Sequence, residues 1–189
     1  MPLILASTSP IRRQLLDAAG VEHEAVAPNV DEAAVKARFT DPAQIAGELA
    51  AAKACSISGD WVIGSDSVVS VEGRLFDKPK DRPEAAEHLR FFSGKTMILT
   101  SAVALARGGV EEWRHVGSAT LQVRALSDKF IEHYLAAEWP EVGYCVGVFR
   151  LEGRGVQLFE TIVGDHFTIL GMPLLPLLGA LRTRGLMPA

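Results

Sequence analysis

Hydrophobic residues along this chain form two kinds of pattern: short continuous or alternating runs, and longer segments with helical spacing. The first kind predicts β-strands and the second predicts amphipathic helices. The strand-like runs cover residues 3–6, 21–27, 61–71, 75–76, 95–106, 113–123 and 156–163. Helical spacing covers residues 11–19, 41–57, a segment from 82, a segment from 127, and 173–182. Strands and helices alternate at first and longer antiparallel strands follow, so we expect a mixed α/β protein around one twisted sheet.

Residues with strong local preferences mark the ends of several predicted elements. Ser7-Thr8-Ser9-Pro10 predicts a hydroxyl cap with proline in the first turn of the helix that follows. Gly108-Gly109 predicts a hairpin between the two long strands. The apolar stretch 170–187 contains two prolines and two arginines. It therefore predicts a packed C-terminal helix and no membrane span.

Composition limits the classes of function. A chain of 189 residues can form one domain or two closely joined lobes around a real core. The net charge of −4 argues against broad affinity for nucleic acid or a membrane surface, so any phosphate binding needs a local basic cluster. Cys55 and Cys145 form no CxxC, and the opening residues lack the pattern of a signal peptide. We expect a protein of the reducing cytoplasm.

The segment "LASTSPIRRQLL", residues 5–16, is the first candidate for chemistry. It places Ser7 and Ser9 at a strand-to-helix turn, with Arg12 and Arg13 just inside the helix. Free amides at a helix N-terminus, hydroxyl donors and a guanidinium together suit a phosphate. The alternative is a capped helix with solvated arginines.

Carboxylates form the second candidate. Asp66 interrupts the apolar run "VIGSDSVVS", residues 62–70, which predicts either a bend in the strand or a ligand or base aimed at a site. Asp31 and Glu32 are adjacent, either as solvent-facing residues or as the acidic start of a helix.

Lysines form the third candidate. In "FDKPKDRPEA", Pro79 separates Lys78 from Lys80 and keeps the backbone extended, so both ammonium groups should point to one side. Lys53 and Lys95 are further cations with a weaker case. Hydroxyls, cations and carboxylates together are the parts needed for metal-assisted attack on a polyphosphate. Walker A and GxGxxG motifs are both absent.

In these segments the chain resembles the Maf family of nucleoside triphosphate pyrophosphatases, named for an association with septum formation. The resemblance spans nearly the whole chain and keeps its order, through "LASTSPIRRQLL", "DE" at 31–32, "IGSDSVV", "KPKD", "FFSGKT" and "GDHFTILGMPL" at 164–174. It implies one Maf-like domain over residues 1–189, with two lobes and a deep central cleft as in inosine triphosphatases. It also implies hydrolysis of a nucleoside triphosphate to the monophosphate and pyrophosphate with a divalent metal, Mg²⁺ or Mn²⁺.

The resemblance also implies roles for individual residues. Asp66 matches the proton acceptor, which would explain an interruption of the strand at that point, and it pairs with Glu32 as a metal ligand. Glu32 and Lys78 join Asp66 as catalytic residues. The expected substrate-binding residues are Ser7, Ser9, Arg12, Arg13, Lys53, Lys80 and Glu152.

Departures from the family pattern bear on the base of the nucleotide. The usual G-A-D-T is Gly-Ser-Asp-Ser here, and Met97 replaces a histidine typical of the dTTP/UTP subgroup. Glu152 stands where that subgroup tends to have glutamine. A carboxylate accepts hydrogen bonds from the adjacent donors of guanine, so we expect a guanine-type substrate, with 7-methyl-GTP as the example.

Other functions remain as alternatives. They are a dTTP/UTP pyrophosphatase of the same family, a pyrophosphatase for deaminated purines, and a non-catalytic nucleotide-binding regulator of septum formation. The expected partner is a small-molecule nucleoside triphosphate, without nucleic acid or membrane, and a homodimer is one option.

Overall fold

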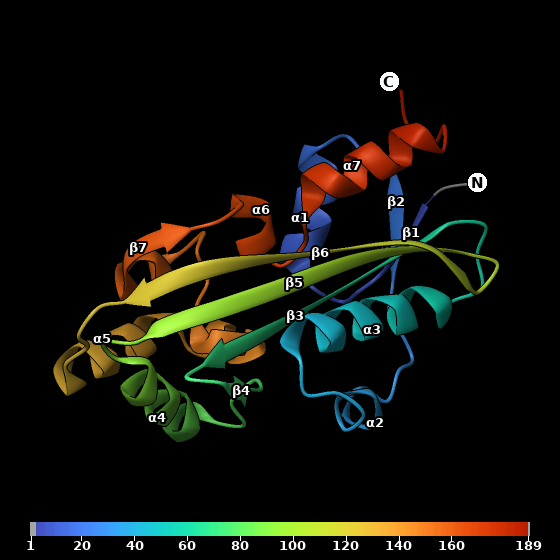
Figure 1. Cartoon of the computed structure of the whole chain (residues 1–189). Coiled ribbons are helices and arrows are strands. Elements are labelled where there is room, and N and C mark those ends of the chain that lie inside the picture. Colours follow the sequence, from blue (N-terminus) through green and yellow to red (C-terminus); the bar gives the residue numbers. More distant parts are fainter. Residues whose placement is uncertain (1–2, 189) are drawn as a thin grey trace. The chain divides into compact units, whose positions relative to one another are not determined.

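Strands and helices follow the predicted order in the computed structural model, which describes residues 3–188 (Figure 1). Seven strands form one mixed sheet in the order β2-β1-β3-β5-β6-β7, with β4 paired to β3. The strands are β1 (Leu3–Ala6), β2 (His23–Val26), β3 (Val62–Val71), β4 (Arg74–Phe76), β5 (Thr96–Arg107), β6 (Val110–Val123) and β7 (Phe159–Val163). The mixed α/β prediction is confirmed.

Helices and 3₁₀ turns connect the strands along the chain. The helices are α1 (Pro10–Ala18), α2 (Glu32–Lys36), α3 (Pro42–Cys55), α4 (Arg82–Phe92), α5 (Asp128–Glu138), α6 (His166–Ile169) and α7 (Leu174–Thr183). The 3₁₀ turns are η1 (Glu141–Tyr144), η2 (Val146–Val148) and η3 (Arg154–Leu158). Within residues 3–188, no helix is long and apolar enough to cross a membrane.

The chain divides into two compact units, and β3, β5 and β6 each contribute to both. The first unit comprises Met1–Ser67, Thr100–Gly117 and Asp165–Ala189. The second comprises Val68–Leu99 and Ser118–Gly164. The single domain with a deep central cleft stays a prediction.

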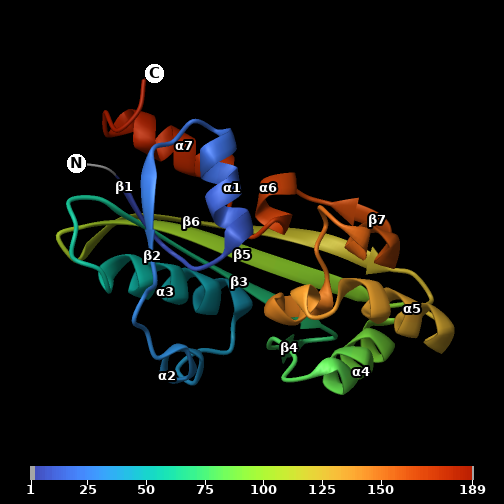
Figure 2. The ribbon, with the colours of Figure 1, turned by 180° about the vertical axis from the view of Figure 1, so that it is seen from behind.

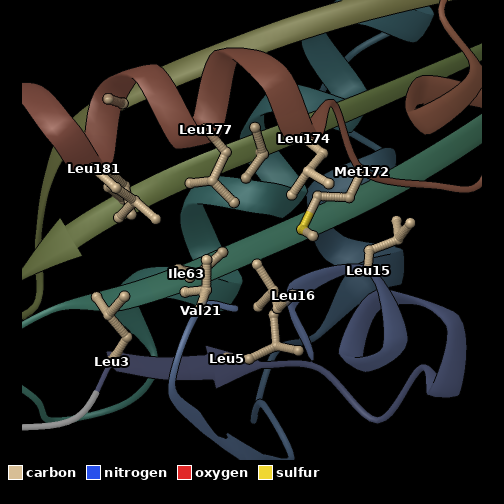
Figure 3. Close-up of a cluster of buried hydrophobic side chains, with 13 residues drawn as sticks. Leu3, Leu5, Leu15, Leu16, Val21, Ile63, Met172, Leu174, Leu177 and Leu181 are labelled. Atoms are coloured by element: carbon tan, nitrogen blue, oxygen red, sulfur yellow. The ribbon is translucent and has the colours of Figure 1, made fainter. Parts of the chain in front are cut away.

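In the first unit, helices cover both faces of the sheet. Figure 2 shows α1 and α7 on one face and α3 on the other. Leucines of α7, among them Leu177 and Leu181, point toward the strands and join Leu16 and Ile63 in a buried cluster (Figure 3). Burial of such side chains contributes roughly 1.5–3 kcal/mol each, so α7 is the packed C-terminal helix that the sequence predicts.

In the second unit, α4 and α5 pack against each other beside the aromatic cluster of Phe76 and Phe92. The strand predicted over 156–163 is shorter than expected, because residues Arg154–Leu158 form η3. A Cβ on Gly155 would lie 2.4 Å from the carbonyl oxygen of Arg150. Glycine permits this close approach of the backbone within the turn, and β7 begins only at Phe159.

Candidate active site

The turn between β1 and α1 brings hydroxyl groups and a guanidinium together, as the sequence predicts. Ser7 is buried just after β1, and its Oγ accepts a hydrogen bond from the backbone N–H of Ser9 at 3.2 Å. Ser9 occupies the N-cap position of α1 with Pro10 next to it. Within the described residues, however, the Ser9 hydroxyl accepts no hydrogen bond from an amide of that first turn. The predicted hydroxyl cap is therefore wrong for Ser9, although Pro10 lies in the first turn as expected.

Arg12 points back from α1 to the end of β1 and to the C-terminal segment. Its Nε donates to the carbonyl of Gly171 at 2.9 Å, and its Nη2 donates to Ser67 Oγ at 3.2 Å. A longer contact of 3.5 Å joins Nη1 to Ser7 Oγ. Arg13 is exposed on the same helix. The structure therefore distinguishes the two arginines: Arg12 is held among polar groups, whereas Arg13 has the position of a solvated residue.

Side chains alternate between the two faces of β3, which separates its polar residues into two groups. Ser65 and Ser67 share a face with Ile63 of the α1–α7 cluster, and both hydroxyls lie within hydrogen-bond distance of the Gly171 carbonyl. Asp66 points to the opposite face, where α3 lies. There Lys53 Nζ donates to Asp66 Oδ1 at 2.6 Å.

Glu32 completes an ionic triad with Lys53 and Asp66. Its Oε1 lies 2.8 Å from Lys53 Nζ. The neighbouring Asp31 caps α2 by accepting a hydrogen bond from the Ala34 amide at 3.0 Å, so Glu32 is the first residue of that helix. Asp31 and Glu32 are both exposed and begin a helix, and that helix presents Glu32 to Lys53.

The strand is continuous through Asp66, contrary to the predicted interruption, since β3 runs unbroken from Val62 to Val71. Gly64 and Ser65 fit within β3 because each has a specific neighbour there. A Cβ on Gly64 would lie 2.1 Å from the carbonyl oxygen of Ala50, so only glycine allows α3 to lie this close. Ser65 donates to the Ala102 carbonyl at 2.7 Å.

The triad lies just beyond the carboxyl end of β1, beside the middle of the parallel strand β3. In the pairing of β1 with β3, the last partners are Ala6 and Gly64. Asp66 therefore lies beyond the end of β1, and Ser7 follows that end directly. Open α/β sheets bind ligands in the crevice outside the carboxyl ends of their strands. This geometry favours the end of β1 as the place where a substrate contacts the first unit.

The charges of the triad fit a divalent cation that the substrate helps to hold. Two carboxylates and one ammonium leave a single negative charge around Lys53. Within residues 3–188, no group of three or more His, Cys, Asp or Glu side chains could hold a metal ion alone. Mg²⁺ is commonly bound by one or two carboxylates together with substrate phosphates and water. Glu32 and Asp66 fit that type of site.

The predicted lysines belong to the second unit. Pro79 is buried, whereas Lys78 and Lys80 on either side of it are exposed, in agreement with the alternation expected for this segment. The Lys80 amide donates to Glu84 Oε2 at 2.6 Å, and Asp81 Oδ1 accepts from the Glu84 amide at 2.8 Å. These two hydrogen bonds at the start of α4 fix the backbone beside both lysines.

Glu152 lies exposed in the turn before η3. The turn is anchored by Arg150, whose Nη2 donates to the buried Glu138 at 3.0 Å. Burial, with a smaller effect of the Glu152 carboxylate, raises the pKa of the nearby Cys145 thiol to about 11. Tyr134 adds a second anchor by donating to the Val148 carbonyl at 3.0 Å. Glu152 is thus an exposed carboxylate on a firmly held turn.

Comparison with known proteins finds similarity over nearly the whole chain. The Maf-like protein family matches residues 2–184. A protein named 7-methyl-GTP pyrophosphatase from Rhizobium meliloti is 48% identical, over 99% of this chain and 98% of its own length.

The chain belongs to the Maf-like protein family.

Two further similarities are more general. A protein named nucleoside triphosphate pyrophosphatase from Nitrobacter hamburgensis is 47% identical, over 98% of this Maf-like chain and 95% of its own length. The crystal structure of a dITP/XTP pyrophosphatase from Mycobacterium abscessus aligns with a TM-score of 0.41 and 20% identity, over 65% of this chain and 73% of that one.

The structure of this Maf-like protein also shows polar groups that the sequence did not single out. Ser67 Oγ lies 2.8 Å from Ser101 Oγ, and Ser101 donates to the Thr168 carbonyl at 2.8 Å. Gly171, with φ of +104°, provides the carbonyl that Arg12 and Ser65 share. A serine in an apolar strand such as "MILTSAVALA" is the available signal for Ser101, but it does not reveal the partner.

Proposed function

We propose that this Maf-like protein hydrolyses a nucleoside triphosphate to the monophosphate and pyrophosphate, with 7-methyl-GTP as a preferred substrate. The observation that carries the proposal is the Lys53 triad with Asp66 and Glu32, just beyond the carboxyl end of β1. High identity to a relative named 7-methyl-GTP pyrophosphatase supports the choice of substrate.

In the proposed reaction, water attacks the α-phosphorus and Asp66 accepts its proton. Lys53 holds Asp66 Oδ1 at 2.6 Å, so the carboxylate is fixed in orientation and its second oxygen takes the proton. The new bond joins the water oxygen to the α-phosphorus, and the bond from that phosphorus to the α,β-bridging oxygen breaks. Pyrophosphate leaves with the electron pair.

Cationic side chains stabilise the negative charge of the triphosphate. We assign this role to Arg12, which the Gly171 carbonyl orients, and to Lys78 and Lys80 on the turn before α4. Glu32 and Asp66 would hold the divalent cation, which when bound neutralises phosphate charge and activates water. Ser7 and Ser9 offer their hydroxyl groups at the N-terminus of α1.

Glu152 is our candidate for recognition of the base. A carboxylate can accept from the N1–H and N2–H₂ groups of guanine with both oxygens. Methylation at N7 adds positive charge to the purine, which a nearby carboxylate stabilises. Thymine and uracil instead present an N–H between two carbonyls, which would face the carboxylate lone pairs unfavourably.

The test is a comparison of kcat/KM for 7-methyl-GTP, GTP, dTTP and UTP with Mg²⁺ or Mn²⁺, with pyrophosphate release as the readout. We expect 7-methyl-GTP to be preferred, and Glu152→Gln to shift the preference toward dTTP and UTP. Glu160→Gln removes an exposed carboxylate of β7 in the same unit and is the matched control. Orthophosphate and a diphosphate as first products would reject the reaction. A wild-type preference for dTTP or UTP would reject the role of Glu152.

A further inference from the structure

The guanidinium of Arg12 is held along two of its edges by groups far away in the sequence. The Gly171 carbonyl accepts from Nε, and Ser67 Oγ accepts from Nη2. Ser67 itself lies 2.8 Å from Ser101 Oγ, a hydroxyl of β5 that is completely buried. The hydrogen bonds therefore connect Ser101 to Arg12 through Ser67.

Proton counting gives this chain of hydroxyls a direction. A serine hydroxyl has one proton to donate and two lone pairs to accept with. Ser101 donates its proton to the Thr168 carbonyl at 2.8 Å, so Ser67 must supply the proton that joins the two hydroxyls. The alternative acceptor for Ser67, the Gly171 carbonyl, is more distant at 3.3 Å. With its proton directed to Ser101, Ser67 presents lone pairs to Arg12.

The series of hydrogen bonds ends at Thr168, which is itself held in place. Thr168 belongs to α6, and Asp165 Oδ2 accepts from both its backbone amide at 2.7 Å and its hydroxyl at 2.9 Å. Arg12 donates to Ser67, Ser67 to Ser101, and Ser101 to this anchored turn. Long arginine side chains lose considerable rotamer entropy when they are ordered. Because Ser67 Oγ already holds the Arg12 side chain before the substrate binds, less rotamer entropy of Arg12 is lost on binding.

We propose that Ser101 is a positioning residue that orients Arg12 for the phosphates of the substrate, through Ser67. The proposal rests on the proposed role of Arg12 in triphosphate binding. It extends the functional site to β5 and to the α6 turn, neither of which supplies a charged group to it. The same series of hydrogen bonds explains why Ser101, a fully buried position of β5, carries a hydroxyl in place of a hydrophobic side chain.

The experiment is a double-mutant cycle on the full chain, with KM and kcat for 7-methyl-GTP measured for wild type, Ser101→Ala, Arg12→Ala and the double variant. We expect Ser101→Ala to lower kcat/KM about tenfold, chiefly through KM, and to have almost no further effect once Arg12 is absent. Ser70→Ala, which removes another buried serine hydroxyl from β3, is the matched control and should leave kcat/KM unchanged. Ser101→Thr keeps the hydroxyl and should retain more activity than Ser101→Ala.

The cycle separates the inference from the proposed function. If wild type hydrolyses no triphosphate, the proposed function fails. If wild type is active and Arg12→Ala is impaired, but Ser101→Ala matches wild type, the positioning role is wrong. An equal loss from Ser101→Ala with and without Arg12 would also overturn it, because a general structural defect acts in both backgrounds. Should Ser101→Ala not fold, Ser101→Cys, whose thiol is a weak donor and a weak acceptor, weakens the same hydrogen bonds and decides the question by the same comparison.

Discussion

Replacing Gly64 with alanine would test whether the contact between β3 and α3 sets the position of Lys53. The added Cβ would lie 2.1 Å from the Ala50 carbonyl oxygen and 2.5 Å from the Ala54 nitrogen. Real Cβ atoms essentially never come closer than 3.0 Å to such atoms, so α3 would have to retreat by about 0.9 Å. Lys53 lies between these two residues on the same helix. Its Nζ would move with α3 and lose the 2.6 Å contact with Asp66.

The displacement has two measurable consequences. Overpacking of a tight core contact costs about 1–3 kcal/mol, which for a chain of this size lowers Tm by roughly 2–12 °C. A misplacement of about 1 Å in a catalytic arrangement can lower the rate by about 10²-fold. We therefore expect Gly64→Ala to lower both Tm and kcat/KM, with the larger relative effect on kcat/KM because the triad depends directly on α3.

Differential scanning calorimetry gives Tm, and pyrophosphate release from 7-methyl-GTP gives kcat/KM. Gly179→Ala in α7 is the matched control, because an added Cβ there meets nothing within 4 Å. That change should leave kcat/KM intact and keep or raise Tm, since alanine favours a helix over glycine. Wild-type Tm together with wild-type kcat/KM in Gly64→Ala would refute the reasoning, because α3 would then tolerate the extra carbon without moving Lys53.

Three other changes test separate parts of the structure. Asp66→Asn removes the proton acceptor and should lower kcat by about 10²–10⁴ in steady-state assays; near-wild-type kcat would make Glu32 the better candidate for the base. Lys78→Ala and Lys80→Ala should each weaken transition-state binding by about 1.5–3 kcal/mol in kcat/KM, whereas the exposed Lys129→Ala should have no effect. Burial lowers the pKa of His88 below its ordinary 6.5, so the unfolded state binds this proton more readily. Stability should therefore fall as pH drops through 6.5, and His88→Gln should make the decline of Tm shallower; an unchanged slope would contradict this.

The amino-acid sequence by itself determined most of the elements, because their signals are local. The helical spacing after Ser7-Thr8-Ser9-Pro10 and the continuous run of Leu3–Ala6 depend on side chains a few residues apart. The ordered motifs likewise indicated the Maf-like family before any geometry was known. Short helices such as α2 and α6 were not predicted, because a hydrophobic pattern over four or five residues is too short to show helical periodicity.

Only the tertiary structure decided which residues meet. Lys53 and Asp66 are 13 residues apart, and Arg12 and Gly171 are 159 apart, so neither contact follows from local spacing. The continuity of β3 through Asp66 has the same origin. A small or charged residue within a strand looks like a break until the helix packed on Gly64 and the ammonium beside Asp66 are in place. Periodicity tells which face of an element a side chain occupies, but the partner on that face depends on how distant segments pack together.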